Sequence, residues 1–391
     1  ACAAIGSWSW ARSLLLSARA GSKDRVLLTP KHYIHALSAC AGVLSKPGGP
    51  EAQGAMKFAL ALIQDLRDAG WLKGQQGEDA YVLAMRTCVP AQDAWSALAL
   101  LDNLEDDGIP EGPALRSAAM QALSGAGEWR AALSILDRVL KEGEQPGGAM
   151  YVAAMAACAR GGVSDLALEL LERVLVEYPG DKEIVTAAYH GAITACAECG
   201  QCEKATSLLQ KMRQDSLAVV TIAEYNAAIL ACCRARQSFA ALSLLGDMFV
   251  DGGIWQPKGS GIHENGLKPN EMSYNLVMRT FAQEGRWQTV MDLILSMRDE
   301  GGLVPGVSSY NIVVDSLARA GEWEQALRVL EEMKSIGVRP TEFTYNCCMA
   351  ACEKSGMWEE TMSVMRDMKD QGDLVPDSYA FSTAMMACSK A

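Results

Sequence analysis

The chain lacks long hydrophobic runs and has little positive charge. Its 391 residues are 50% hydrophobic, yet no charge-free apolar stretch approaches the ~18 residues that span a bilayer, so we expect no membrane partner. Basic residues are outnumbered, with 35 Lys and Arg against 47 Asp and Glu and a net charge of -12. This balance argues against attraction of nucleic acid by the overall field of the protein, so any such binding would need a local basic track.

The patterns that mark common enzymes are also missing. The zinc deaminase pattern, a His-x-Glu with a later Pro-Cys-x-x-Cys, does not occur. No glycine-rich phosphate loop of the Walker or dinucleotide-binding type stands between a strand and a helix. We therefore predict no enzymatic activity, no catalytic residues and no cofactor.

The cysteines are numerous, but their spacing favours packing over disulfides or metal sites. Free Cys behaves as a small hydrophobe, and a recurring buried slot for it indicates a reducing compartment. The stretch CAECGQC has metal-ligand spacing, but its first Cys belongs to the recurring slot and no second cluster exists, so we predict no metal there. The slot, near the end of an apolar stretch, holds Cys2, Cys40, Cys88, Cys158, Cys196, Cys232, Cys352 and Cys388, and CAECGQC holds Cys196, Cys199 and Cys202.

A unit of about 35 residues repeats along the chain and is clearest at 307–341, VSSYNIVVDSLARAGEWEQALRVLEEMKSIGVRPT. All but one of the full units carry a Tyr near the start, a small or aliphatic residue four places later, and usually a Gly seven places after that. Self-similarity at this period is typical of a solenoid of stacked supersecondary units. The aligned tyrosines are Tyr33, Tyr81, Tyr151, Tyr189, Tyr225, Tyr274, Tyr310 and Tyr345.

Two helices per unit follow from the apolar spacing. Tyr310, Val314 and Leu317 recur at helical intervals, Gly321 interrupts them, and a second stripe begins at Ala326. The pattern predicts an all-α fold of stacked antiparallel helical hairpins. Small residues that let the two helices of a hairpin approach closely are Ala97, Ala132, Ala167, Ala205, Ala241 and Ala326.

The repeat also predicts the organisation of the chain. Residues 1–29 and 378–391 read as partial repeats, so the chain looks like an internal fragment, and an insertion lies near 253–266. Full units are expected at 30–77, 78–112, 113–147, 148–185, 186–221, 222–270, 271–306, 307–341 and 342–377.

The phrases MSYN, SSYN and FTYN, the stretch AGEWEQALRVLEEMKSIGVRP and the repeat length resemble pentatricopeptide repeats over essentially the whole chain. Departures cluster toward the N-terminal half, where Arg116 replaces the Tyr and Gln92 and Arg236 replace the Gly. The resemblance implies a right-handed superhelical solenoid that binds single-stranded RNA, one base per repeat. It further implies a monomer acting in RNA metabolism of a mitochondrion or chloroplast, in processing, stabilisation, splicing or translation.

The resemblance places the fifth and last residues of a unit beside one base and the second residue against the face of that base. The early fifth-slot residues Ile34, Val82 and Val152 offer only apolar contact, whereas four consecutive later units carry Asn. Base reading is therefore expected over 222–377, and a mainly scaffolding role over 30–221. The other early fifth-slot residues are Ser117 and His190, and Ser382 holds the slot in the closing fragment.

By the same resemblance the four Asn units favour pyrimidines and the last reads uracil, while the unit that ends in Gly306 is permissive because it lacks a second side chain. A different interpretation stays open, in which each Asn caps the first turn of its helix. The predicted pairs are Asn226 with Asn270, Asn275 with Gly306, Asn311 with Thr341, and Asn346 with Asp377.

Cations recur at one position near the end of the first helix, which would suit a line of phosphate contacts along a single strand. They would equally suit the negative end of a helix dipole. The function expected overall is a sequence-selective RNA-binding adaptor, and the competing class is a protein-binding helical scaffold. The recurring cations are Arg160, Arg234, Arg319, Lys354 and Lys390.

Overall fold

The computed structural model describes residues 8–20, 29–42, 48–109, 111–215, 218–251, 267–371 and 374–390. Every regular element within these ranges is an α-helix, which confirms the all-α prediction. None of the described helices combines the length and the apolar character that crossing a bilayer requires. The expected insertion near 253–266 lies outside the described residues.

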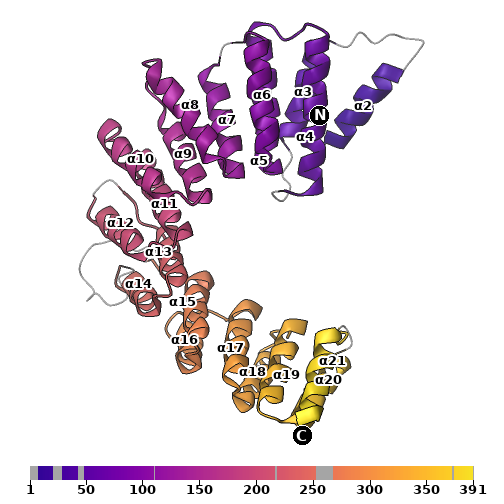
Figure 1. Ribbon diagram of the computed structural model, residues 1–391, viewed down its shortest axis with the longest axis vertical. Coiled ribbons are helices and arrows are strands. Elements are labelled where there is room, and N and C mark those ends of the chain that lie inside the picture. The colour runs from indigo at the N-terminus through magenta and orange to yellow at the C-terminus, as the bar shows by residue number, and fades with distance from the viewer. Residues whose placement is uncertain are drawn as a thin grey trace. The chain divides into compact units, whose positions relative to one another are not determined.

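Within the described ranges, helix follows helix along the chain (Figure 1). They are α2 (Trp8–Ala20), α3 (Pro30–Ala41), α4 (Pro50–Asp68), α5 (Gly74–Ala91), α6 (Ala94–Asp106), α7 (Pro113–Ala126), α8 (Trp129–Lys141), α9 (Gly148–Arg160), α10 (Ser164–Glu177), α11 (Lys182–Glu198), α12 (Cys202–Gln214), α13 (Ile222–Arg234), α14 (Ser238–Asp251), α15 (Glu271–Gln283), α16 (Trp287–Asp299), α17 (Val307–Ala320), α18 (Trp323–Ser335), α19 (Glu342–Lys354), α20 (Trp358–Asp370) and α21 (Ser378–Lys390).

The chain divides into two compact bodies. The N-terminal body comprises residues 1–195 and 215–219, and the C-terminal body comprises residues 196–214 and 220–391. Within each body, an odd-numbered helix packs against the even-numbered helix that follows it, as α5 does with α6 and α17 with α18. These pairs are the helical hairpins expected from the repeat, and Figure 1 shows them stacking in chain order within each body.

The hairpins stack through their first helices. Helix α7 contacts α5 and α9 in the N-terminal body, and α17 contacts α15 and α19 in the C-terminal body. Second helices pack against the first helix of their own unit and that of the next unit, as α18 does with α17 and α19. Within each body the first helices therefore form a row, which brings equivalent positions of successive units side by side.

In several hairpins a buried Tyr near the start of the first helix bonds to an acidic residue near the end of the second helix. The hydroxyl of Tyr81 donates to Asp107 at 2.6 Å, and that of Tyr310 donates to Glu332 at 3.2 Å. Burial, and then the charge of the neighbouring Glu332, raises the pKa of Tyr310 to about 12. The phenol therefore stays protonated and keeps donating to the carboxylate near the end of the second helix.

Departures from the repeat are accommodated locally. Arg116, in place of the Tyr, is largely buried and pairs with Glu142 at 2.9 Å and with Glu144. Gln92 and Arg236, in place of the helix-ending Gly, still adopt left-handed φ values of 54° and 55°. A residue with a side chain costs roughly 1–2 kcal/mol more than Gly in that conformation, so these hairpins keep the turn geometry at a cost in stability.

Two helices begin earlier than the expected unit boundaries. Helix α5 starts at Gly74, inside the expected unit 30–77, and α11 starts at Lys182, inside 148–185. At α11 the carboxylate of Asp181 accepts from the main-chain N–H groups of Glu183 and Ile184, both at 3.1 Å. This cap starts the helix one turn upstream of the boundary that the Tyr alignment suggests.

Candidate nucleic-acid interface

The four fifth-slot asparagines occupy equivalent positions on successive first helices of the C-terminal body. Asn226 lies on α13, Asn275 on α15, Asn311 on α17 and Asn346 on α19, each half-buried and one turn inside its helix. The helices are capped instead by the preceding residues Thr221, Asn270, Gly306 and Thr341. The interpretation of the fifth-slot Asn as helix caps is therefore wrong, and their amides are not consumed by helix ends.

The last-slot residues, in contrast, have a structural role of their own. Asn270 accepts the main-chain N–H of Ser273 at 2.9 Å, and Asp377 accepts that of Ala380 at 2.8 Å. Thr341 accepts the main-chain N–H of Thr344 at 3.4 Å. Each therefore caps the first helix of the next unit while its side chain stays at the surface between two first helices.

Three of the four predicted pairs are brought together. Asn346 Nδ2 lies 3.4 Å from Asp377 Oδ2, a direct though long contact. Asn226 is joined to Asn270 through one residue, since the Ser273 hydroxyl lies 2.6 Å from the Asn226 amide oxygen and 2.9 Å from that of Asn270. The side chains of a fifth slot and the following last slot thus line the same site.

Asn311 and Thr341 are joined in the same way, through Thr344. The Thr344 hydroxyl lies 2.6 Å from the Asn311 amide oxygen and 3.0 Å from the Thr341 hydroxyl. This arrangement repeats the one around Ser273 two units earlier. The spacing of the fifth slot, the last slot and the intervening hydroxyl is therefore a property of the stacked units.

The fourth pair is not assembled. Gly306 has no side chain, and the carboxylate of Glu271 fills the space beside it, accepting the Gly306 N–H at 3.2 Å and the Ser309 hydroxyl at 3.0 Å. The amide oxygen of Asn275 is buried and has no hydrogen-bond partner among the described residues. Asn275 thus offers its amide without a neighbouring last-slot side chain.

Two clefts open on the row of first helices at these positions. One, of about 360 Å³, is lined by Asn311, Ser308 and Phe343 together with Arg279. The other, of about 590 Å³, is lined by Asn346, Phe343 and Tyr379 together with Lys354. Each cleft therefore combines an amide, an aromatic ring and a cation.

The aromatic rings and Arg279 were missed by the sequence analysis, which concentrated on the fifth, last and cation slots. Phe343 and Tyr379 hold the second slots of successive units and are 50% and 53% exposed. Their slot position was the available signal, since second-slot residues were expected to lie against a base. Arg279 lies one helical turn before the cation slot, on the same face of α15.

The predicted phosphate-contacting cations have partners in the protein. Arg234 donates to the main-chain carbonyl of Glu198 at 2.6 Å, and Lys354 and Arg160 donate likewise to the carbonyls of Arg319 and Ser124. These carbonyls lie at the ends of preceding first helices, where a cation offsets the negative end of the helix dipole. The helix-dipole role is thus present, and the phosphate role stays a prediction.

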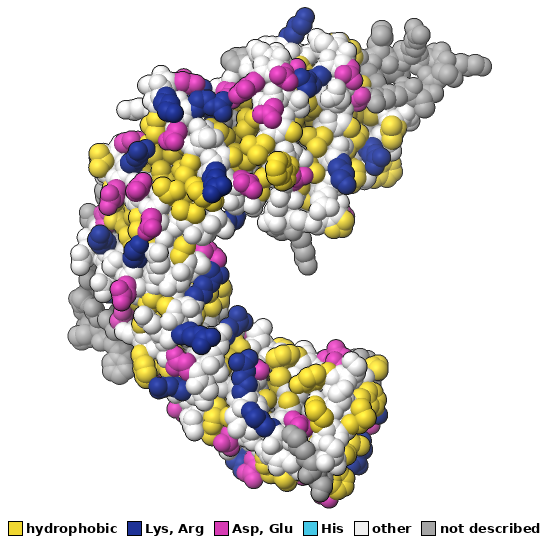
Figure 2. Space-filling view, in the orientation of Figure 1, with side chains coloured by type: hydrophobic (Ala, Val, Ile, Leu, Met, Phe, Trp, Pro, Cys, Tyr) yellow, Lys and Arg dark blue, Asp and Glu magenta, His cyan; other side chains and the backbone are white. Residues whose placement is uncertain are grey.

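Arg319 differs from these cations. Its side chain is 58% exposed and pairs with Asp315 within the same helix at 2.8 Å. The side chain of Lys390 lies outside the described residues. Figure 2 shows several Lys and Arg side chains in dark blue over α13, α15 and α17, on a chain whose net charge is -12.

Comparison with known families decides the membership of the chain. The model of the PPR repeat family matches residues 305–354 and 340–390, and that of the PPR repeat matches 187–217, 225–253 and 272–302. The chain belongs to the pentatricopeptide repeat family. All four fifth-slot Asn fall within the matched pentatricopeptide repeats, and the hairpins upstream of residue 187 continue the same fold.

Solved pentatricopeptide repeat structures share this fold. A crystal structure of the protein PPR10 in complex with an 18-nt psaJ RNA element aligns with 100% of the chain and 52% of its own length, at 17% identity and a TM-score of 0.63. A variant of PPR10 with three Cys replaced by Ser, also in complex with that RNA element, aligns equally well. The chain thus spans about half the length of these proteins. A search of curated protein sequences finds no match.

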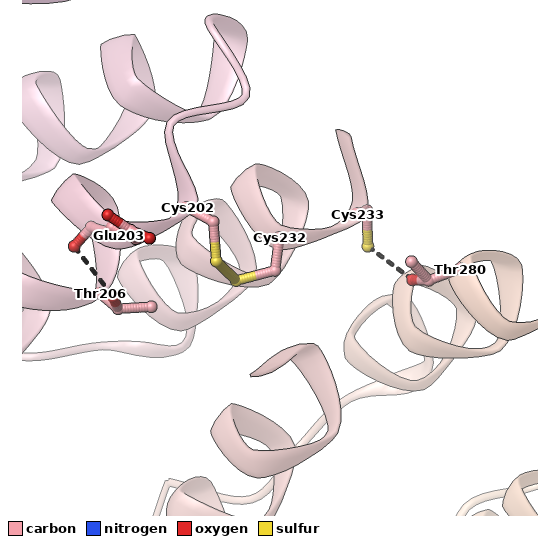
Figure 3. The surroundings of a disulfide bond; sticks show 6 residues. All are labelled: Cys202, Glu203, Thr206, Cys232, Cys233 and Thr280. Carbon is pink, nitrogen blue, oxygen red and sulfur yellow. Dashed lines mark hydrogen bonds between the residues drawn. A yellow bond between two sulfur atoms is a disulfide. The ribbon is translucent and has the colours of Figure 1, made fainter. Parts of the chain in front are cut away.

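The cysteine slot of these pentatricopeptide repeats holds buried thiols at five of the described positions, with two exceptions, Cys232 and Cys388, while Cys2 lies outside the described residues. Cys232 is not free: it forms a disulfide with Cys202, at the start of α12, with Cα atoms 4.7 Å apart (Figure 3). Cys88 illustrates the expected case, since burial raises the pKa of its thiol to about 12. Cys388, on α21, is exposed.

The candidate metal site in CAECGQC loses one ligand to this disulfide. Cys202 bonds to Cys232, so its sulfur is not available beside Cys196 and Cys199. Across the described ranges, no three His, Cys, Asp or Glu side chains are grouped in a way that would hold a metal ion. The absence of metal from this stretch remains a prediction for chemical analysis.

Proposed function

We propose that the chain is a sequence-selective adaptor for single-stranded RNA, without catalytic activity, that reads bases with its repeats over 222–377. The observation that carries this proposal is the series of fifth-slot amides on the exposed row of first helices, three of them beside a polar last-slot side chain. Pentatricopeptide repeat membership and the RNA-bound structures of PPR10 support it. The repeats over 30–221, with apolar residues at several fifth slots, act mainly as scaffold.

The site around Asn346 has the most complete set of recognition groups. A base entering the cleft of about 590 Å³ would lie between the rings of Phe343 and Tyr379, with its edge toward Asn346 and Asp377. Stacking of a base on aromatic side chains contributes about 1–3 kcal/mol and tolerates any base, so the rings supply affinity. The amide and carboxylate supply the choice of base, because they alone offer directed donors and acceptors.

The preferred bases are pyrimidines, with uracil at the site of Asn346 and Asp377. This preference is the one that the family resemblance implies for Asn at the fifth slot. Asn275 lacks a last-slot partner, so its site accepts more than one base. The cations at the ends of the first helices, Arg319 and Lys354 above all, would follow the backbone phosphates.

In the cell the protein would act on transcripts of a mitochondrion or chloroplast, in processing, stabilisation, splicing or translation. This assignment rests on the family resemblance. The chain covers 52% of the length of PPR10. We expect a monomer, because single-stranded RNA is bound along one row of first helices. Protein partners would act beside this row.

Selection from a random RNA pool tests RNA binding and base choice together. The expected result is an enriched motif with a core of four pyrimidines ending in uracil. Filter binding with single-stranded RNA at moderate salt separates this function from that of a protein-binding scaffold, which would retain no RNA. Absence of retention, or retention without any enriched motif, would contradict the proposal.

The aromatic rings provide a sharper test. Changing Phe343 and Tyr379 to Ala should weaken RNA binding by about 1–3 kcal/mol for each base that loses its stacking partner. Phe381 is the matched control, because it is an exposed ring on α21 whose contact is with Lys369 of α20, at 5.5 Å from the ammonium group. Phe381→Ala should leave the affinity unchanged, and equal losses in all variants would refute a stacking role for the cleft.

A further inference from the structure

The orientation of the Asn311 amide is fixed by a residue of the next unit. Thr344 Oγ1 accepts the main-chain N–H of Thr341 at 3.0 Å, so its own proton is free to be donated. The nearest acceptor is Asn311 Oδ1, at 2.6 Å. The Thr341 hydroxyl, at 3.0 Å, can donate to Thr344 in turn. The hydroxyl of Thr344 therefore donates to the amide oxygen of Asn311 and keeps that oxygen facing Thr344. The amide N–H groups of Asn311 are then turned away from Thr344.

Asn226 is held in the same way by Ser273. The Ser273 hydroxyl accepts the main-chain N–H of Asn270 at 3.3 Å, and its one proton lies between two amide oxygens, Asn226 Oδ1 at 2.6 Å and Asn270 Oδ1 at 2.9 Å, of which that of Asn226 is the nearer. Ser273 and Thr344 occupy the third position of their units, and both side chains are fully buried. Two of the four base-reading sites thus have a buried hydroxyl from the next unit in contact with the amide oxygen of the fifth-slot Asn.

The other two sites lack this contact for different reasons. The third-position residue beyond Asn275 is Ser309, but its hydroxyl donates to Glu271 at 3.0 Å. The residue beyond Asn346 is Ala380, which has no hydroxyl. Accordingly, the amide oxygens of Asn275 and Asn346 are both buried with no hydrogen-bond partner in the described part of the chain. The four sites form two classes, anchored and unanchored.

We propose that the third-position hydroxyl of the following unit is a positioning residue that sets which groups a fifth-slot Asn presents to RNA. This inference rests on the proposed function. An amide whose oxygen faces this hydroxyl turns its N–H donors toward the base. Anchored sites therefore favour a base edge that accepts, such as the O2 carbonyl and the N3 ring nitrogen of cytosine. The amide of Asn275 has neither an anchoring hydroxyl nor a last-slot side chain beside it, so it can rotate by half a turn and meet either kind of edge, and its choice of base is weaker.

Thr344→Val tests the anchor at Asn311 with little change in shape, and Thr344→Ser restores the hydroxyl. Binding is measured for a panel of RNAs that carry each base at one position of the selected motif. For Thr344→Val, the ratio of Kd values between the worst and best base should fall roughly three- to tenfold at the Asn311 position alone, the range expected for one net hydrogen bond. Thr344→Ser should keep the wild-type ratio.

Two further variants separate positioning from stability. Ser309→Ala removes an equally buried third-position hydroxyl that contacts Glu271 instead of an Asn. It should lower the melting temperature as Thr344→Val does, but change no base preference. Ala380→Ser places a hydroxyl where the partnerless oxygen of Asn346 can accept it, and should sharpen the preference at that position.

The outcomes separate failure of this positioning role from failure of the proposed RNA binding. If the wild-type chain binds no RNA, the proposed function fails and the inference fails with it. If RNA is bound with a defined motif but Thr344→Val leaves the ratio at the Asn311 position unchanged, only the inference is overturned. A loss of preference spread evenly over all positions would overturn it too, because destabilisation of the fold lowers binding to every sequence alike.

Discussion

A single amide at the surface carries much of the recognition proposed for each repeat. Asn346 is half-buried one turn inside α19, and its Nδ2 group lies 3.4 Å from the carboxylate of Asp377. Because a carboxylate only accepts, the amide must present its N–H groups toward Asp377. Oδ1 of Asp377 accepts the cap N–H and Oδ2 lies nearest to Asn346, and each oxygen keeps a further lone pair for a base edge that donates.

Replacing Asn346 by Thr should change the base preferred at this site from uracil toward guanine. The shorter side chain makes room for a purine and frees Asp377 to accept from the N–H groups of the guanine edge. Stability should fall by only a few tenths of a kcal/mol, the cost of Thr within a helix. Selection experiments on both proteins should give motifs that differ at one position near the 3′ end, with the RNA parallel to the chain as the family resemblance implies.

Asn275→Thr is the matched control for this change. Its last-slot partner is Gly306, which offers no side-chain acceptor, so no guanine preference should appear there. Identical motifs for wild type and Asn346→Thr, or a change spread over several positions, would show that Asn346 and Asp377 do not read a base.

At the scale of the element, the ends of the first helices link successive units. The carbonyl groups of the last turn lack partners within their own helix. Lys354, at the end of α19, donates to the carbonyl of Arg319 near the end of α17, and Arg234 does the same for Glu198 at the end of α11. A cation in this slot therefore contributes to stacking, whether or not RNA is bound. Its ammonium or guanidinium group has further donors that remain for a phosphate.

Changing Arg319 and Lys354 to Ala should weaken binding to all RNA sequences alike. The slope of log Kd against log salt concentration should fall by about 0.7 for each phosphate that no longer meets a cation. Arg366→Ala is the control, because this exposed Arg lies on the second helix α20 and contacts the carbonyl of its own helix at Met362. An unchanged slope in the double variant would show that these two cations do not contact phosphates.

At the scale of the whole molecule, the repeats differ in what their fifth slots can do. Val82, at the fifth slot of α5, is 9% exposed and packs into the core, whereas the four asparagines remain half-buried at the surface of α13 to α19. Val82 adds apolar burial, whereas the asparagines add directed hydrogen-bonding groups. Stability and base recognition should therefore be separable along the chain.

Alanine at Asn226, Asn275, Asn311 and Asn346 together should erase base preference, with thermal stability changed only slightly. Val82→Ala should have the opposite effect, lowering the free energy of unfolding by about 1–2 kcal/mol through reduced burial, with base preference unchanged. Thermal denaturation and the single-position RNA panel measure the two properties. A loss of preference in Val82→Ala comparable with that of the fourfold variant would show that the early repeats also read bases.

The sequence by itself determined the hairpins. Tyr310, Val314 and Leu317 recur at helical spacing before Gly321, and the structure has a helix that ends at that glycine, with φ of 79°. Residues three or four apart lie on the same face of a helix, so the apolar stripe of each helix follows from the helical geometry alone. For the same reason the repeat spacing alone places the fifth-slot Asn on one face of successive helices.

Contacts between units were decided by the tertiary structure. Nothing in the local pattern shows that Thr344 contacts Asn311, 33 residues earlier, or that Cys202 bonds to Cys232, 30 residues later. Nor does it show that Ser309, at the same position as Thr344, donates to Glu271 because Gly306 leaves space for that carboxylate. These partners depend on how closely neighbouring first helices stack and on which side chains fill the space between them. Spacing along one helix does not contain that information, because it is set only when two units pack together.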